Sequence, residues 1–233
     1  MKPTTLIDSA LQSDPLADQE MGAPVPREDG SLPERIAESD IRDCRMLLTL
    51  IETEPLKLSN VAGGAVGFEC SFQPAAGLRF LNARLTLTLE APQGIRIVDL
   101  APTEVHGGAV SVTRNRGGQF EVKGPFMAAQ LQNERGVQYL DYHCLVYGSG
   151  SGTPLARWDF VEDPDRQGGL AKRHALFLTL AAQGSIHGRA TLSGEVERPG
   201  LLGVGDRLTR WFRLEASPQG PHQPFQFEIP TGP

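Results

Sequence analysis

Polar and aromatic side chains alternate along residues 139–147 in a pattern that suits ligand binding. Tyr139, Asp141, His143 and Tyr147 share one face if this segment is a β-strand, because the side chains of a strand alternate between its two faces. Same-face neighbours lie about 7 Å apart, so Asp141 and His143 would be close without a direct hydrogen bond. A general acid–base pair or half of a metal site would need help from another strand.

We interpret this face as an exposed binding surface rather than a catalytic centre. Two tyrosines that flank a histidine and an aspartate suit a sugar or a protein partner. A tryptophan on the following segment would complete a concave face. The candidate ligand-binding residues are therefore Tyr139, Asp141, His143, Tyr147 and Trp158.

No complete catalytic, metal-binding or cofactor motif accompanies this face. The polar stripe in residues 187–197 contains His, Ser and Glu, but a catalytic triad needs these groups to converge, whereas one strand spreads them apart. The five histidines show neither H-x-H nor H-x3-H spacing. The glycine-rich residues 148–152 lack the Lys-Ser/Thr of a phosphate-binding loop. We expect no catalytic residue, no metal and no cofactor, with a hydrolase site assembled from distant residues as an alternative.

The three cysteines fit structural positions. Cys44, Cys70 and Cys144 each alternate with apolar neighbours, and a thiol in such surroundings acts as a small hydrophobic group. An odd number of cysteines without metal-ligand spacing indicates reduced thiols and a cytoplasmic location.

Residues 206–214 fit either a helix or a strand. As a helix they would carry a basic stripe of arginines three residues apart, and as a strand they would alternate charged and apolar side chains. In both cases this segment is a candidate for partner contact. The residues concerned are Arg207, Arg210, Trp211 and Arg213.

From residue 44 onward the hydrophobic pattern has a period of two, which predicts strands. Glycine-containing loops at 114–118 and 148–152 predict two hairpins, and no stretch long enough for a helical crossover separates the strands. The 26 glycines and 18 prolines punctuate many short elements. We therefore predict one domain over residues 44–233, an all-β antiparallel sandwich of jelly-roll or immunoglobulin-like style. The clearest strands are 66–73, 81–90, 155–161, 176–180, 186–197 and 224–229.

Residues 1–43 carry the whole charge imbalance of the chain. They hold ten acids and four bases, which equals the formal net charge of −6, so the remaining residues are balanced. Their composition predicts a largely disordered arm with a short helix at about residues 32–40, capped by Ser31. A second amphipathic patch contributes the candidate docking residues Leu6, Ile7 and Leu11.

Charge and hydropathy exclude several classes of partner. A neutral body with an acidic arm lacks the clustered positive surface that nucleic acid requires. No apolar stretch approaches the roughly 20 residues of a membrane-spanning helix, and the first residues lack the apolar core of a signal peptide. Long alternating strands also occur in pore-forming proteins, but 6% aromatic residues is too few for their aromatic girdles.

Together these patterns predict a non-catalytic protein that binds another protein or forms a homo-oligomer. It would be a subunit or accessory component of a larger bacterial assembly, with the N-terminal arm as the docking segment, because disordered arms with short amphipathic patches suit folding on binding. A carbohydrate- or small-ligand-binding sandwich is the first alternative.

Overall fold

The computed structural model describes residues 2–14, 36–58, 62–106, 111–114, 120–123, 144–163, 168–170, 173–199, 208–214 and 222–231. Strands dominate this part of the chain, which confirms the prediction of an all-β fold. In chain order the elements are β1 (Thr4–Ser13), α2 (Glu38–Arg42), β2 (Arg45–Lys57), β3 (Ala62–Gln73), β4 (Arg79–Glu90), β5 (Ile97–Ala101), β6 (Glu104–His106), β7 (Ser111–Arg114), β8 (Phe120–Lys123), β9 (Cys144–Ser149), β10 (Leu155–Val161), β11 (Arg173–Leu180), β12 (Gly184–Arg198), β13 (Leu208–Leu214) and β14 (Gln223–Ile229).

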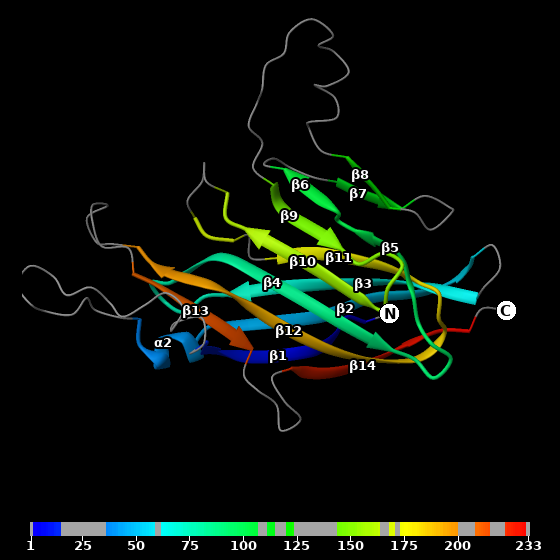
Figure 1. The fold of residues 1–233 in the computed structure, drawn as a ribbon, viewed down its shortest axis with the longest axis horizontal. Helices are drawn as coiled ribbons and strands as arrows, with labels where there is room; N and C mark the ends of the chain where they lie inside the picture. The colour runs from blue at the N-terminus through cyan, green and yellow to red at the C-terminus, as the bar shows by residue number, and fades with distance from the viewer. Residues whose placement is uncertain are drawn as a thin grey trace, which may run out of the picture.

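Twelve of the strands form one antiparallel sheet in place of the two separate sheets of the predicted sandwich. Its hydrogen-bonded order is β5-β11-β3-β2-β1-β13-β12-β4-β10-β9-β6, and β14 pairs with the first half of β12. β7 and β8 form a hairpin of their own, and β8 contacts β5 (Figure 1). The long strands β2, β3, β4 and β12 run along the length of the molecule in the same view.

The sheet curls into a nearly closed shape. Its two ends, β5 and β6, are separated in the chain by residues 102 and 103 alone, which span about 10 Å at most. The Gly148 N–H on β9 donates a hydrogen bond to the Thr103 carbonyl at 2.8 Å. A Cβ on Gly148 would lie 2.2 Å from the Pro102 carbonyl oxygen, so this approach requires glycine.

The core lies inside the curled sheet and consists of the side chains that point inward from each strand. Burial alternates along β4 and β12, as the period of two in the sequence predicts. Each fully buried aliphatic or aromatic side chain contributes about 1.5–3 kcal/mol relative to leaving it exposed. The largest fully buried side chains include Trp158, Phe68, Phe72, Phe80, Phe160 and Phe212.

The first residues of the chain are part of this sheet, which corrects the prediction of a disordered or helical segment. β1 pairs with β2 on one side and with β13 on the other. Ile7 and Leu11 are buried in the core, and Leu6 packs against it. A spacing of four residues fits both the helical and the strand period, so the sequence alone does not distinguish them.

The one helix in the described residues is shorter than predicted. α2 spans Glu38–Arg42, and its N-cap residue Ala37 makes no side-chain hydrogen bond to the helix. Ser31, the predicted cap, lies outside the described residues. Ile36 and Ile41 are buried, so tertiary packing rather than capping stabilises this single turn. No helix in the described part of the chain is long and apolar enough to cross a membrane.

Both predicted hairpins are present. β7 pairs with β8, and β9 pairs with β10 across residues 150–154. The ambiguous segment at 206–214 forms the strand β13 from Leu208, where β1 and β12 supply hydrogen-bonding partners on both sides.

Candidate functional site

The candidate site is the outer face of the β9–β10 hairpin. On β10, Ala156, Trp158 and Phe160 are fully buried, whereas Leu155 and Val161 are 40% and 48% exposed. The two faces follow directly from the alternation of side chains along a strand. The hairpin therefore buries one apolar row in the core and presents another to solvent.

The neighbouring strands extend this face. Tyr147 on β9 lies opposite Asp159, so it shares the outer face of β10, and it is 47% exposed. Glu104 on β6 lies opposite Tyr147 at the edge of the sheet. We call this outer face the hairpin patch. Its apolar residues are Tyr147, Leu155 and Val161, and its charged residues are Arg84, Glu104, Arg157 and Asp159.

Charged side chains of both signs lie within the hairpin patch. Arg84 Nε lies 2.5 Å from Asp159 Oδ1, and Arg157 Nε lies 3.5 Å from Asp159 Oδ2. All three side chains are partly exposed, so these ion pairs contribute about 0–1 kcal/mol each to stability. Together with Glu104, the two arginines and Asp159 give a surface with no net charge.

The predicted ligand-binding residues do not form one surface: two of them lie on opposite faces of the β9–β10 hairpin, and the other three lie outside the described residues. Tyr147 is on the outer face, as predicted. Trp158 is fully buried on the opposite face of the hairpin, so it cannot join Tyr147 in one concave surface. Tyr139, Asp141 and His143 lie outside the described residues.

The predicted N-terminal docking residues pack inside this protein rather than on its surface. Ile7 and Leu11 belong to its own core, and Leu6 is partly buried against that core. These side chains are therefore corrected from partner contacts to packing residues of β1.

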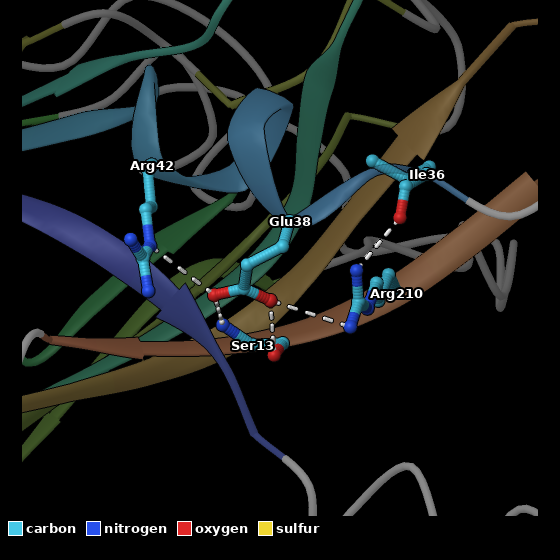
Figure 2. A network of polar contacts seen from close by, with 5 residues as sticks. All are labelled: Ser13, Ile36, Glu38, Arg42 and Arg210. Carbon is cyan, nitrogen blue, oxygen red and sulfur yellow. Dashed lines mark hydrogen bonds and ion pairs between the residues drawn. The ribbon is translucent and has the colours of Figure 1, made fainter.

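Arg210, another predicted partner contact, belongs to a network that joins α2 to β1 and β13 (Figure 2). Ser13 Oγ donates a hydrogen bond to Glu38 Oε2 at 2.5 Å. Arg210 Nη2 lies 3.4 Å from the same Glu38 oxygen, and Arg210 Nη1 donates to the Ile36 carbonyl at 2.7 Å. Arg42 Nε lies 3.7 Å from Glu38 Oε1. Arg210 thus fixes the start of α2, and its role as a partner contact stays a prediction.

The remaining residues of that prediction differ in their placement. Trp211 and Arg213 are partly exposed on the other face of β13 from the buried Phe212. Arg207 lies outside the described residues. Trp211 and Arg213 stay candidates for contact with a partner.

The Glu38 network makes stability depend on acid pH. Burial raises the pKa of Glu38, but the hydrogen bonds from Ser13 and the charges of Arg210 and Arg42 outweigh it, so the pKa lies below the ordinary 4.5. A carboxyl with a lowered pKa stabilises the fold above its unfolded pKa, and this contribution disappears as the pH falls through its folded pKa. The exposure of Glu38 limits the effect to about 1 kcal/mol or less.

We therefore expect the difference in unfolding free energy between wild type and Glu38→Gln to be largest near neutral pH and to shrink below pH 4.5. Urea unfolding at a series of pH values measures it. Asp8→Asn is the control, because Asp8 on the same strand β1 pairs with Arg45 outside this network. A constant difference across the pH range would contradict this role of Glu38.

The cysteines that the structure describes are packing residues. Cys44 and Cys70 are free and buried. Burial raises the pKa of both thiols, which disfavours the reactive thiolate. Among the described residues, no group of three or more His, Cys, Asp or Glu side chains is placed to hold a metal ion.

Sequence inspection missed the importance of the two apolar residues at the ends of the outer β10 face. The signal was present, since Leu155 and Val161 alternate in step with the charged residues Arg157 and Asp159.

Comparisons with known proteins show weak structural likeness only. No family model and no curated protein matches the chain. A solved structure titled "Pore forming protein" has a TM-score of 0.33 and 10% identity, over 80% of this chain and 86% of that chain. The Clostridium perfringens NetB toxin in its membrane-inserted form has a TM-score of 0.30 and 10% identity, over 95% of this chain and 94% of that chain. Likeness of this degree assigns neither family nor function to the chain.

Proposed function

We propose that this protein is a non-catalytic subunit that binds a second copy of itself through the hairpin patch. The observation that carries the proposal is that most of the exposed large apolar side chains of the described residues share one face of the sheet. Among the described residues, four large apolar side chains are exposed, and three of them, Tyr147, Leu155 and Val161, lie on one face of the β9–β10 hairpin. Burial of apolar surface is the main driving force of protein association.

The composition of the hairpin patch favours a protein partner. Tyrosine and arginine are enriched in protein interfaces, and the patch combines Tyr147 with Arg84 and Arg157. A large aromatic ring between charged side chains gives both buried area and directional contacts.

Charge favours a second copy of this chain as that partner. The formal net charge of −6 opposes the association of two copies over most surfaces. The patch itself balances Arg84 and Arg157 against Asp159 and Glu104, so two patches can face each other without net repulsion. A two-fold arrangement would place the arginines of one copy near the acids of the other.

Sedimentation velocity over a dilution series tests this proposal. Wild type should reach a mass above the 25.2 kDa of one chain as its concentration rises. The double variant Tyr147→Ser/Leu155→Ser should weaken the association by about tenfold or more, because it removes two large apolar side chains and Tyr is enriched among hot spots. Val98→Ser is the matched control, since Val98 is exposed to a similar degree on β5, outside the patch.

Three outcomes would overturn the proposal. Wild type could stay at the mass of one chain throughout the series, or the double variant could associate as strongly as wild type. Release of a dye from liposomes by wild type in the same concentration range would place its function at a membrane instead. We also propose a cytoplasmic location, which an odd number of cysteines without metal-ligand spacing favours.

A further inference from the structure

A cavity of about 470 Å³ opens at the end of the β9–β10 hairpin. Most of the residues that line it are apolar, and they come from β4, β6, β9 and β10 and from the segments next to these strands. Ligand cavities of proteins commonly measure about 300–1,000 Å³ and are mostly apolar, so this one has the size and the surface of a small-molecule site. Its apolar lining includes Leu78, Phe80, Val105, Val146, Val161 and Leu170.

Part of this apolar wall belongs to the core of the protein and is therefore preformed. Leu78, Phe80 and Val146 are buried members of the core. The Phe80 ring packs against Phe72 at 5.6 Å and against Phe212 at 5.2 Å between ring centroids. Side chains held by the core need no ordering when a ligand enters, which lowers the entropic cost of binding.

The short segment that carries Leu170 is held against β4 by hydrogen bonds of its backbone. The Leu170 N–H donates to the Phe80 carbonyl at 2.9 Å, and the Gly169 N–H donates to Glu162 Oε1 at 2.7 Å. Gly169 has a φ of +82°, and a Cβ there would lie 2.9 Å from the Arg79 Cβ, so this close approach requires glycine. Leu170 thus has a fixed place in the wall beside Phe80.

The polar side chains of the lining already have partners within the protein. Arg79 Nη2 lies 2.6 Å from Glu197 Oε2, and Arg79 pairs with a second carboxylate as well. The His174 ring packs against the Phe160 ring at 4.5 Å between centroids. Asp163 takes part in an interaction of its own. None of these three side chains is left free for a ligand, so the described lining offers apolar surface as its means of recognition.

We propose that this cavity binds a small molecule through an apolar body, of the class of medium-chain alcohols and similar aliphatic compounds. The apolar body lies against Leu78, Phe80 and Val146, and its affinity comes from the apolar area that it buries. This site is distinct from the proposed self-association, because Tyr147 and Leu155 do not line the cavity.

A series of straight-chain alcohols tests recognition by apolar area. Isothermal titration of the full chain compares 1-butanol, 1-hexanol and 1-octanol, which share one hydroxyl and differ only in apolar length. Each buried CH₂ is worth about fourfold in affinity, so 1-hexanol should bind about tenfold or more tightly than 1-butanol. The heat-capacity change of binding should be negative, because apolar surface is buried. Equal affinities along the series, or no binding by any of the alcohols at millimolar concentration, would overturn the proposal.

Methyl NMR spectra of the full chain locate the bound alcohol. The methyl signals of Leu78, Val146 and Leu170 should shift when 1-octanol is added, because these side chains line the cavity. The signals of Leu155, which is exposed on the hairpin patch outside the cavity, should stay in place. Shifts at Leu155 without shifts at the cavity residues would show that the alcohol adheres to the exposed patch and would overturn the proposal.

A tryptophan variant of the cavity wall gives a second test of location. Val105, which packs against the core from β6, lines the cavity, so Val105→Trp should fill part of it and weaken 1-octanol by about tenfold or more. Val98→Trp is the control, because Val98 lies on β5 and does not line the cavity. Unchanged binding in Val105→Trp would contradict the site. Sedimentation of the Tyr147→Ser/Leu155→Ser variant tests self-association separately, so either proposal can fail without the other.

Discussion

Replacing Arg79 by alanine is expected to lower the free energy of unfolding by about 3–5 kcal/mol. The Glu197 side chain is 1% exposed, and both Nε and Nη2 of Arg79 contact its Oε2, at 2.8 and 2.6 Å. Arg79 also contacts Glu162 at 3.1 Å. Removing the guanidinium leaves two carboxylates near each other in a region of low dielectric without the charge that compensates them.

Urea unfolding of matched variants measures this effect. Arg84→Ala is the control, because its ion pair with Asp159 is partly exposed and should cost about 0–1 kcal/mol. The double variant Arg79→Met/Glu197→Leu should regain much of the loss, since apolar residues of similar size can replace a buried pair. A loss in Arg79→Ala no larger than in Arg84→Ala would show that the pair is solvated in solution.

The second large effect concerns the N-terminal strand. Leu11→Ala is expected to destabilise the protein by about 2–5 kcal/mol, because Leu11 is fully buried and its truncation leaves a cavity. Deleting residues 1–13 should abolish cooperative unfolding, since it removes a strand that pairs on both sides and leaves β2 and β13 as open edges.

Urea unfolding and near-UV circular dichroism test this role of β1. Asp8→Ala on the same strand should cost about 0–1 kcal/mol, because the Asp8–Arg45 pair is half-exposed. If Leu11→Ala were as mild as Asp8→Ala, or if the truncated chain unfolded like the full chain, the first residues would be the disordered arm that their composition predicts.

Some of the acidic residues in residues 1–43 form ion pairs within the protein. Three of its acids pair with arginines of the body: Asp8 with Arg45, Glu38 with Arg210 and Asp40 with Arg198. Part of the acidic excess therefore attaches this region to the rest of the protein. Salt should weaken these internal contacts as it would weaken those with a basic partner.

The period of the hydrophobic pattern predicts most strands but not their partners. The segments at 81–90 and 186–197 are strands as expected, because half-buried strands alternate in the sequence itself. The strand β1 was not predicted, because the Ile7–Leu11 spacing fits both the helical and the strand period. Its strand conformation depends on pairing with β2 and β13, which follow it at a distance in the chain. The segment that forms β13 fits a helix or a strand in the sequence, and its pairing with β1 and β12 explains why it is a strand.

Contacts between segments that are distant in the chain limit the prediction of side-chain placement. Glu197 continues a polar stripe with Glu195 in the sequence, yet it is buried. Val196 beside it is buried too, so the burial of Glu197 does not follow from the alternation of side chains along β12. Glu197 lies opposite Arg79 and pairs with it, and Glu162 and Gly169, which follow β10 in the chain, pack against Arg79. The buried Arg79–Glu197 pair was therefore invisible in the sequence.

The candidate site was predictable only in part, because the face on which each residue lies depends on the pairing between strands. Tyr147 is exposed as expected from its alternation with apolar neighbours. Whether Trp158 joins it depends on cross-strand register: Trp158 lies opposite Gly148 and Asp159 lies opposite Tyr147. A slip of one residue would exchange these faces, and the loop that sets the register cannot be placed from composition alone.

Hydroxyl-radical footprinting at increasing protein concentration tests the proposed contact surface most directly, because it reports the exposure of individual side chains. We predict that the oxidation rates of Tyr147 and Leu155 fall as the protein associates, while the rate of Val98, which is equally exposed on β5, stays constant. Constant rates at Tyr147 and Leu155 over the range in which the mass rises would contradict the hairpin patch as the contact between copies.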